Sequence, residues 1–395
     1  MNILYICPRD PRVANTGSTM RTAFLWKALK ELGTVYTVIY PSKEVDLSRV
    51  EVREGLERDR IHVVPNNQTS WWNWLVVYVS RKLMKNGSLS FTPRGRMRRA
   101  IGWPDVKFDC VVARYIDQAA NRVAWKLGPL YVDIDDLPTT VFDKINKFRL
   151  PSPLRPLAGV LVRIVQERVL LHARGLWVTN QEDLRLLQGR LQTRVLRNIA
   201  PNAGIGYAVD GRQEDLLLTV GSLGYGPNVQ GIEWFLGNIW PEVRQAMPTL
   251  KYVIAGGGLD EATQGRWESV LGVHVLGFVD DLAGVYERAR AVVTPVLSGA
   301  GTCVKTIEAC KRGRKVFATD CAARGFDAVE RSALQIEVFK GAEDFVARLC
   351  AWLELSESSR QARQKEILSA SNRINSIDDF FRSVREVLDP IAKQG

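Results

Sequence analysis

The segment RAVVTPVLSGAGTCVKTIEACKRGRKVFATD, from Arg290 to Asp320, carries the clearest structural pattern in the chain. An apolar, β-branched run comes first, then a glycine turn, then a helical pattern, then a second short apolar run. Strands that alternate with helices in this way form parallel sheets with helices on both faces. The sequence therefore predicts an α/β fold with a strand–helix–strand unit here.

The same alternation extends outward from this stretch in both directions. The runs LLLTVGSL, LKYVIAGGG and VHVLGFV precede it, and the first half of the chain carries ILYICP, TVYTVIYP, FDCVVARY, GPLYVDIDD and RGLWVTNQ. A chain of 395 residues is too long for one ordinary core. We therefore predict two doubly wound domains at residues 1–200 and 201–375, joined by a Gly/Asn/Pro-rich linker at 198–215, with a final amphipathic helix at 376–395 that packs back toward the first domain.

Composition and charge narrow the class of protein. The chain is 46% hydrophobic and 25% charged, its six cysteines form no CxxC pair, and no apolar run reaches the ~20 residues of a membrane span. These features favour a globular protein with reduced thiols in a cytosol over a disulfide scaffold. Because Met1 leads directly into a strand-like run, we expect no signal peptide. Residues 1–200 carry a net charge of +14 and the remainder −3. A basic first half indicates an anionic partner, which could be nucleic acid, a phosphorylated ligand or an acidic membrane surface.

The glycine turn and the helix after it predict an anion site. The start of a helix exposes unpaired N–H groups, and Gly299, Gly301 and Thr302 would let an anion approach them closely. Lys305 can add a full charge against a phosphate, and the carboxylate of Glu308 suits a pair of hydroxyls such as a ribose diol. The combination fits a nucleotide diphosphate attached to a sugar. The alternative is an ordinary helix start at which Lys305 and Glu308 form a solvated pair.

This block, with TVGSLGYGPNVQGIEWFLGNIWPEV and LKYVIAGGG…VHVLGFVDDL…YERARAVVTP before it, resembles the donor-binding signature of retaining GT-B glycosyltransferases of the GT4 type. The resemblance is close over residues 216–326 and covers the first half only in outline. It implies two Rossmann-like domains facing a central cleft, and an enzyme that transfers a sugar from a nucleotide-diphosphate-sugar donor with retention. It also implies no cofactor and no bound metal.

The resemblance assigns roles in the donor site. Glu308 matches the second glutamate of the family's Glu-x7-Glu motif, which holds the ribose, whereas Ala300 stands where the first glutamate would be. Lys305 matches a basic position on the same helix, with an expected catalytic role as well. Phe278 and Val279 resemble the turn that meets the nucleobase.

The usual phosphate clamp departs from the family pattern. Where members carry Arg and Lys after the first strand of this domain, the chain has Gly221 and Ser222 and no basic residue. We expect Gly221 and Ser222 to bind the donor, with Arg197, Lys305, Arg9 or Arg21 supplying the missing charge.

Two segments of the first half match the family more loosely. NTGSTMR resembles the loop at which Gly17 and Ser18 would approach the diphosphate, although Ser18 could simply cap a helix. YVDIDDLP resembles the family's His-Asp segment, with Asp135 in place of the histidine and Asp136 matching the aspartate. Three clustered carboxylates, with Asp133, are costly to place, so we expect Asp135 and Asp136 to be catalytic, steering the acceptor hydroxyl or taking its proton. The alternative is helix capping by Asp136; the three could also hold Mg²⁺.

A basic aromatic stretch predicts contact with a membrane. SWWNWLVVYVSRKLMKNGSLSFTPRGRMRR carries seven basic and no acidic residues between positions 81 and 99. Aromatic residues beside such a cluster are typical of an interfacial contact, and each basic residue near an anionic leaflet contributes on the order of 1 kcal/mol. A buried helix with a solvated basic neighbour is the alternative, and no nucleic-acid-binding motif accompanies the stretch. The residues expected to bind acceptor or membrane are Trp71, Trp72, Trp74, Arg81, Lys82, Arg96 and Arg98.

These expectations combine into one functional hypothesis. The chain would be a glycosyltransferase that acts on a lipid-linked saccharide in polysaccharide or glycan biosynthesis, cytoplasmic and peripheral at the inner face of the membrane. Two alternatives are a nucleotide-sugar epimerase on the same fold and a non-catalytic protein that binds sugar nucleotides or polyanions.

Overall fold

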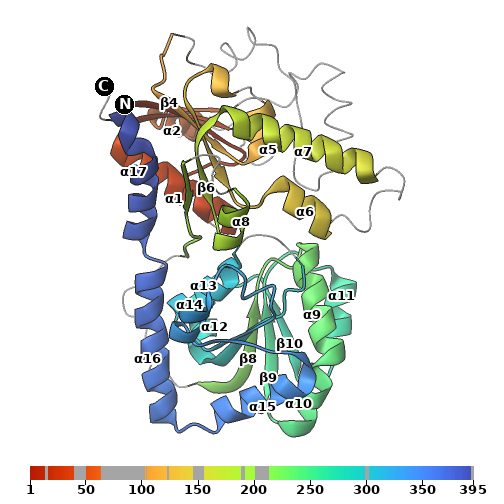
Figure 1. Cartoon of the computed structure of the whole chain (residues 1–395). Coiled ribbons are helices and arrows are strands. Elements are labelled where there is room, and N and C mark those ends of the chain that lie inside the picture. Colours follow the sequence, from red (N-terminus) through yellow and green to blue (C-terminus); the bar gives the residue numbers. More distant parts are fainter. Residues whose placement is uncertain are drawn as a thin grey trace. The chain divides into compact units, whose positions relative to one another are not determined.

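The protein is described from a computed structural model, which covers residues 1–13, 17–39, 50–63, 103, 105–121, 124–145, 155–187, 192–200, 213–298 and 302–392. The chain divides into two compact units. Unit 1 comprises Met1–Arg197 together with Ile377–Gly395, and unit 2 comprises Asn198–Ser376. Each unit is an open parallel sheet with helices packed on it (Figure 1), so the predicted class of two doubly wound α/β domains is confirmed.

Unit 1 contains a seven-stranded sheet in the order β3-β2-β1-β4-β5-β6-β7, with every neighbouring pair parallel. The strand order reverses between β1 and β4, which is the place where open α/β sheets bind ligands outside the strands' carboxyl ends. All residues of β4 and β5 are buried, as expected for strands covered on both faces. The strands are β1 (Asn2–Cys7), β2 (Thr34–Ile39), β3 (Ile61–Val63), β4 (Cys110–Arg114), β5 (Leu130–Ile134), β6 (Ala173–Val178) and β7 (Gln192–Val195).

The helices of unit 1 include one from the far end of the chain. α17 packs on α1 and β7 through buried Phe380, Val384 and Leu388. Gly175 in β6 permits this close approach, because a Cβ there would press against Tyr131 and Val387. The helices are α1 (Gly17–Leu32), α2 (Val50–Arg58), α5 (Ile116–Asn121), the 3₁₀ turn η2 (Ala124–Lys126), α6 (Pro138–Ile145), α7 (Arg155–His172), α8 (Gln181–Leu186) and α17 (Ile377–Ala392).

Unit 2 contains a six-stranded parallel sheet in the order β10-β9-β8-β11-β12-β13. Its strand order reverses between β8 and β11. The strands are β8 (Glu214–Val220), β9 (Lys251–Ala255), β10 (Val273–Gly277), β11 (Ala289–Thr294), β12 (Val316–Ala318) and β13 (Ile336–Val338). The helices are α9 (Gly226–Asn238), α10 (Trp240–Ala246), α11 (Glu261–Glu268), α12 (Leu282–Arg288), α13 (Val304–Lys311), α14 (Ala328–Ala333), α15 (Gly341–Leu353) and α16 (Glu357–Ile374).

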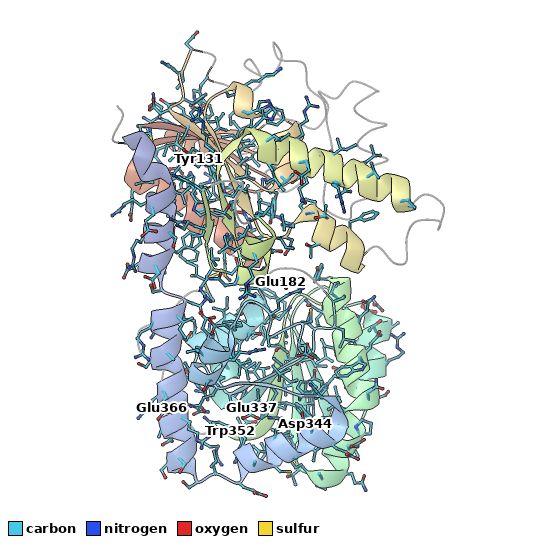
Figure 2. The ribbon with its side chains drawn as sticks, viewed as in Figure 1. Tyr131, Glu182, Glu337, Asp344, Trp352 and Glu366 are labelled. Carbon is cyan, nitrogen blue, oxygen red and sulfur yellow. The ribbon has the colours of Figure 1, made fainter. Side chains whose placement is uncertain are left out.

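Two apolar cores cover the two faces of this second sheet. Along β8, Leu216 and Leu218 enter one core while Leu217 enters the other, because successive side chains of a strand point to opposite faces. This explains why β8 reads as a continuous apolar run. Trp352 belongs to the second core (Figure 2), where its indole N–H donates to the carbonyl of Arg290 at 3.0 Å.

Candidate functional site

The loops at the carboxyl edge of the second sheet are held together by their backbones. Gly221, after β8, donates its N–H to the carbonyl of Ala255 at 3.0 Å, and Gly256, after β9, donates to Gly277 at 2.7 Å. A Cβ on Gly256 would overlap the carbonyl oxygen of Gly221, and its φ of +157° is one that side chains rarely adopt. Only glycine therefore lets the ends of β8 and β9 come this close, and the result is a closely packed backbone surface beside the switch point.

Lys305 brings a positive charge onto this surface. It is the second residue of α13, and its stem lies directly over Gly221, where an added Cβ would meet the lysine Cε. Its ammonium donates to Asn228 Oδ1 at 2.7 Å, and Asn228 Nδ2 donates to the carbonyl of Ser222 at 2.7 Å. Lys305 thus supplies from α13 the charge that the β8–α9 loop lacks in sequence. The sequence did not identify Asn228, which follows a Gly-Pro at the start of α9 without any motif.

Glu308 lies one turn further along α13 in a mostly buried position. Burial raises the pKa of its carboxyl, and the charges of Arg312 and Lys305 offset this only in part. Arg312 Nη2 lies 3.9 Å from Glu308 Oε1, and its guanidinium stacks over the ring of Tyr286 in α12, 5.0 Å from the centroid. Because Lys305 bonds to Asn228 instead, Lys305 and Glu308 are not the solvated pair that the sequence left open as an alternative.

Three further predicted donor residues lie at the carboxyl edge of the second sheet and differ in exposure: Phe278, Val279 and Thr302. Phe278 follows β10 and is 78% exposed, whereas Val279 is half-buried against the core. Thr302 is buried: its carbonyl accepts from Asn198 Nδ2 at 3.3 Å, and Gly325, with a φ of +93°, packs against its side chain. The predicted donor residues Gly299 and Gly301, and Ala300 between them, lie outside the described residues.

The predicted donor residues of unit 1 are placed as follows. Gly17 and Ser18 are the first two residues of α1, at the carboxyl edge of the first sheet, where their side chains are not described. Arg197 follows β7 and is half-buried. The predicted membrane residues Trp71, Trp72, Trp74, Arg81, Lys82, Arg96 and Arg98 all lie outside the described residues.

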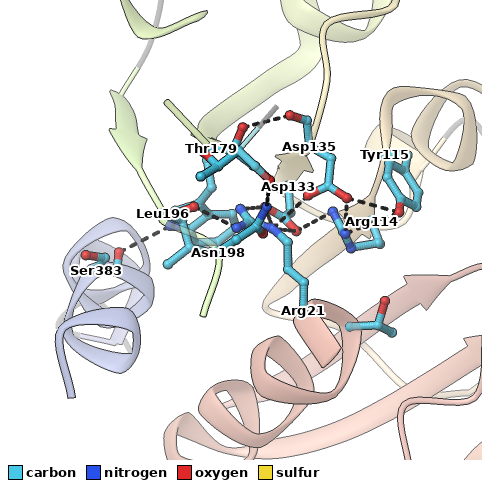
Figure 3. Close-up of polar contacts among 12 residues, drawn as sticks. Arg21, Arg114, Tyr115, Asp133, Asp135, Thr179, Leu196, Asn198 and Ser383 are labelled. Carbon is cyan, nitrogen blue, oxygen red and sulfur yellow. Dashed lines mark hydrogen bonds and ion pairs between the residues drawn. The ribbon is translucent and has the colours of Figure 1, made fainter. Parts of the chain in front are cut away.

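Two buried arginines pair with Asp133, near the end of β5, and with Asp135, just after it (Figure 3). Asp133 receives Arg21 Nη2 at 2.5 Å and Arg114 Nη1 at 2.8 Å. Asp135 lies 3.1 Å from Arg21 Nε and also pairs with Arg114. These contacts offset the cost of gathering carboxylates at a strand end. They also occupy Arg21, whose remaining Nη1 donates to the carbonyl of Leu196 at 2.6 Å, so Arg21 is not available as a phosphate clamp.

Asp135 remains about one-fifth exposed, at the carboxyl edge of the first sheet. Burial alone would raise its pKa, but the charges of Arg114 and Arg21 outweigh burial and lower the pKa below the ordinary value. The hydroxyl of Tyr115 donates to Asp135 Oδ2 at 3.1 Å, and Thr179 donates to the Asp135 carbonyl at 2.9 Å. The arrangement makes Asp135 a fixed hydrogen-bond acceptor and a weak base. Asp136 follows it, between β5 and α6.

Arg114 and Tyr115 are site residues that the sequence did not predict. Tyr115 holds a left-handed backbone, with φ of +76°, directly after β4. Such a backbone costs about 1 kcal/mol or more for a residue other than glycine, and it aims the hydroxyl at Asp135. The sequence does contain a signal for these two residues, because Arg114 and Tyr115 stand at the end of β4 and Asp135 follows β5. Neighbouring parallel strands such as β4 and β5 bring their carboxyl ends together.

Neither a membrane-spanning helix nor a metal-binding cluster is found among the described residues. Across the described ranges, no helix combines the length and apolarity needed to cross a bilayer. No group of three or more His, Cys, Asp or Glu side chains within the same residues could hold a metal ion.

Comparison with known proteins adds the family context. Residues 214–354, a little over a third of the chain, match the family described as Glycosyl transferases group 1. A Klebsiella pneumoniae protein, named as an uncharacterized 44.6 kDa protein in the cps region, is 26% identical over 117 residues, which is 28% of this chain and 30% of that protein. The match thus spans under a third of that relative's length.

Two solved structures resemble the whole chain. A glycosyltransferase from Rickettsia africae matches with a TM-score of 0.63 at 11% identity, covering 100% of this chain and 99% of its own. Anabaena Alr3699/HepE, solved in complex with UDP, matches with a TM-score of 0.64 at 12% identity, covering 99% of this chain and 100% of its own. Both resemblances establish the fold. The chain has the GT-B fold, and its residues 214–354 match the family of glycosyl transferases group 1.

Proposed function

We propose that the protein is a glycosyltransferase. It transfers a sugar from a nucleotide-diphosphate-sugar donor, with retention of the anomeric configuration, to a lipid-linked saccharide acceptor in polysaccharide biosynthesis. The group 1 domain and the GT-B fold support the reaction class, and the relative in a cps region supports the polysaccharide role.

The observation that carries the proposal is the position of Lys305 over Gly221. A diphosphate placed against the backbone edge at Gly221 would find an ammonium there, in a loop with no basic residue of its own. The start of α13 would add backbone N–H groups, since Cys303 makes no side-chain cap, although the N–H of Thr306 already donates to the Cys303 carbonyl at 3.1 Å. Backbone, helix start and charge together suit a pyrophosphate.

Glu308 and the neighbouring structures support a nucleotide on the same edge. The carboxylate accepts hydrogen bonds only, so it would hold the two hydroxyls of a ribose. The exposed ring of Phe278 borders the edge where the base would lie. Anabaena Alr3699/HepE is described with UDP, with UDP and glucose, and with UDP-glucose, so a uridine nucleotide is the first donor to test.

Asp135 and Asp136 are the proposed catalytic contacts on unit 1. Because its pKa is lowered by Arg114 and Arg21, Asp135 would stay ionised and orient the acceptor hydroxyl instead of removing its proton. The proton would then pass to the leaving diphosphate on the same face of the sugar, which yields retention. Lys305 would stabilise the charge that develops on that diphosphate, and no metal ion or other cofactor is required by this scheme.

The proposed acceptor and location follow from the basic aromatic stretch at residues 70–99, which is expected to hold the protein on the cytoplasmic face of an anionic membrane. There it would meet a lipid-linked saccharide. This part of the proposal rests on the sequence alone.

Product analysis tests the proposed reaction. Purified protein would be incubated with UDP-hexoses and with lipid-linked saccharides extracted from the source membranes, and products would be identified by mass spectrometry and NMR. We expect a saccharide that is longer by one hexose, and the new glycosidic bond should have the same anomeric configuration as the donor. An epimerised donor formed without acceptor would assign the protein as an epimerase, and an unchanged donor that nevertheless binds would assign a non-catalytic role.

A further inference from the structure

The long helix α7 lies at the margin of unit 1 (Figure 1), and it carries apolar side chains on two faces. One face is buried: Val169 and Leu170 belong to the core of the unit, and Gly159 packs against the ring of Phe142 in α6. The other face carries Val160, Leu161, Ile164 and Leu171, which are between 45% and 81% exposed. A surface helix normally turns polar residues outward, so this second apolar face requires an explanation.

The four exposed side chains form one stripe, which Glu167 and Arg168 interrupt between Ile164 and Leu171. Spacings of three, four and seven residues from Leu161 to Ile164, Val160 to Ile164 and Ile164 to Leu171 place them on the same side of a helix. From Val160 to Leu171 the stripe extends ~16 Å at 1.5 Å per residue. A third of the large hydrophobic side chains that are exposed in the described ranges lie on this single helix.

Positive charge and an aromatic ring flank the stripe. Arg163 is exposed beside the stripe and Arg168 is exposed within it, and α7 carries three arginines against one glutamate, Glu167, which lies on the same side of the helix. Arg168 lies over the ring of Trp125, 5.7 Å from its centroid, and His172 stacks on the same ring at 4.5 Å. Arginines can extend alongside apolar contacts while their charged heads reach phosphate groups.

We propose that the exposed face of α7 binds an anionic lipid surface, with Val160, Leu161, Ile164 and Leu171 inserted at the boundary between headgroups and acyl chains and with Arg163 and Arg168 on lipid phosphates. Apolar residues flanked by basic ones on one side of a helix are the pattern of a helix that lies in the membrane interface. This inference rests on the proposed function, because a lipid-linked acceptor requires a membrane. The exposed face of α7 is then the described surface that contacts this membrane.

The charge distribution favours lipid over another segment of this chain as the occupant. The stretch from residue 64 to 102 carries seven basic residues and no acidic ones. Packing it beside Arg163 and Arg168 would bring like charges together, which is unfavourable. An anionic bilayer attracts both basic elements at once.

Co-sedimentation with vesicles tests the proposal on the full-length protein. Vesicles of phosphatidylglycerol and phosphatidylcholine would be compared with phosphatidylcholine alone, for wild type and for Ile164→Ser with Leu171→Ser. We expect the double variant to lose about tenfold or more of its partition onto the anionic vesicles. Arg163→Gln is expected to lose about fivefold, with a weaker dependence on salt. The matched control is Leu271→Ser with Val329→Ser, two side chains of unit 2 that are 74% and 77% exposed, and it should bind as wild type does.

Two results would overturn the proposal. One is unchanged binding by the α7 variants. The other is a thermal midpoint that falls by several degrees in the α7 double variant without vesicles, since this would show that another part of the chain covers the face. UDP binding, measured without vesicles on the same proteins, separates this outcome from failure of the proposed function, because the proposed donor contacts Gly221, Lys305 and Glu308 lie in unit 2.

Discussion

The aliphatic stem of Lys305 crosses directly over Gly221, so closely that a methyl group on Gly221 would overlap the lysine Cε. The two residues are far apart in the chain, on α13 and in the loop after β8. Their contact places the ammonium beside the backbone edge at which a diphosphate is proposed to bind, and it makes the absence of a side chain at position 221 part of the site.

Gly221→Ala should therefore weaken donor binding without removing any charge. The new Cβ displaces Lys305 and also approaches Asn228 Nδ2, so the ammonium loses its position. A charge-assisted hydrogen bond contributes roughly 1.5–3 kcal/mol, which predicts an affinity for UDP lower by about 10- to 100-fold in titration calorimetry. The matched control is Gly237→Ala in α9, where a Cβ meets nothing within 4 Å and the affinity should stay unchanged. Equal affinities for all three proteins would contradict the assigned role of Lys305.

Glu308→Gln should abolish the preference for a ribose diol. Wild type is expected to bind UDP more tightly than 2′-deoxy-UDP, and the variant should bind both equally. The carboxylate must be ionised to hold the diol, and burial raises its pKa above the ordinary 4.5. Affinity should thus be present above that raised pKa and lost as the pH falls through it. Calorimetry across the acidic and neutral range checks both points; a diol preference retained by the variant would refute the ribose assignment.

Asp135→Asn should slow transfer and leave UDP affinity intact. The amide loses the acceptor oxygen that would orient the acceptor hydroxyl, which predicts a kcat reduced by about 10- to 100-fold, the range for a positioned polar group. Asp136→Asn is expected to act in the same direction. Tyr115→Phe removes only one hydrogen bond to Asp135 and should cost less. Steady-state kinetics decide: if kcat survives in both aspartate variants, the cluster is structural.

Arg21→Met should destabilise unit 1 strongly. It leaves Asp133 and Asp135 with only Arg114 as counter-charge, and breaking a buried ion pair typically costs about 3–5 kcal/mol. Arg385→Met breaks an exposed pair of the same unit, Arg385 with Glu31, and should cost under about 1 kcal/mol. Urea unfolding of the two variants checks this; similar losses in both would show that burial does not strengthen the network.

The stability of unit 2 should rise with pH in the alkaline range. Burial lowers the pKa of Lys311 from 10.5 to about 8, so between these values the unfolded chain binds a proton that the folded chain releases. The free energy of unfolding therefore increases from about pH 8 to about pH 10.5, by at most about 3 kcal/mol. Lys311→Met should remove the increase in denaturant unfolding at several pH values. A slope that persists in the variant would assign it to another group.

The fold class was predictable because its signals are local. Each strand, such as β8, is a short β-branched or apolar run, and each is followed by a glycine turn or a helical period. Glycines such as Gly256 mark strand ends where backbones meet, and their spacing is visible in the sequence. Repetition of this unit along the chain suffices to predict two parallel sheets.

The contacts of the site were not predictable, because they join residues that are distant in the chain. Lys305 bonds to Asn228, 77 residues earlier, and Arg21 reaches Asp133 across 112 residues. The sequence indicated that the carboxylates after β5 needed compensation, but only the fold reveals that Arg21 and Arg114 provide it. Arg21 is one of four basic residues that the sequence offers as a phosphate contact, and its burial among aspartates excludes it from that role.

A thermal shift of the purified protein with UDP-, GDP-, ADP- and TDP-sugars, repeated with Lys305→Ala, tests the proposed donor site. Our account predicts that one nucleotide series raises the midpoint of wild type in proportion to the logarithm of ligand concentration over Kd, and that Lys305→Ala loses most of the rise. No shift with any series, or a shift that Lys305→Ala retains in full, would contradict a donor site built on Lys305 and Gly221.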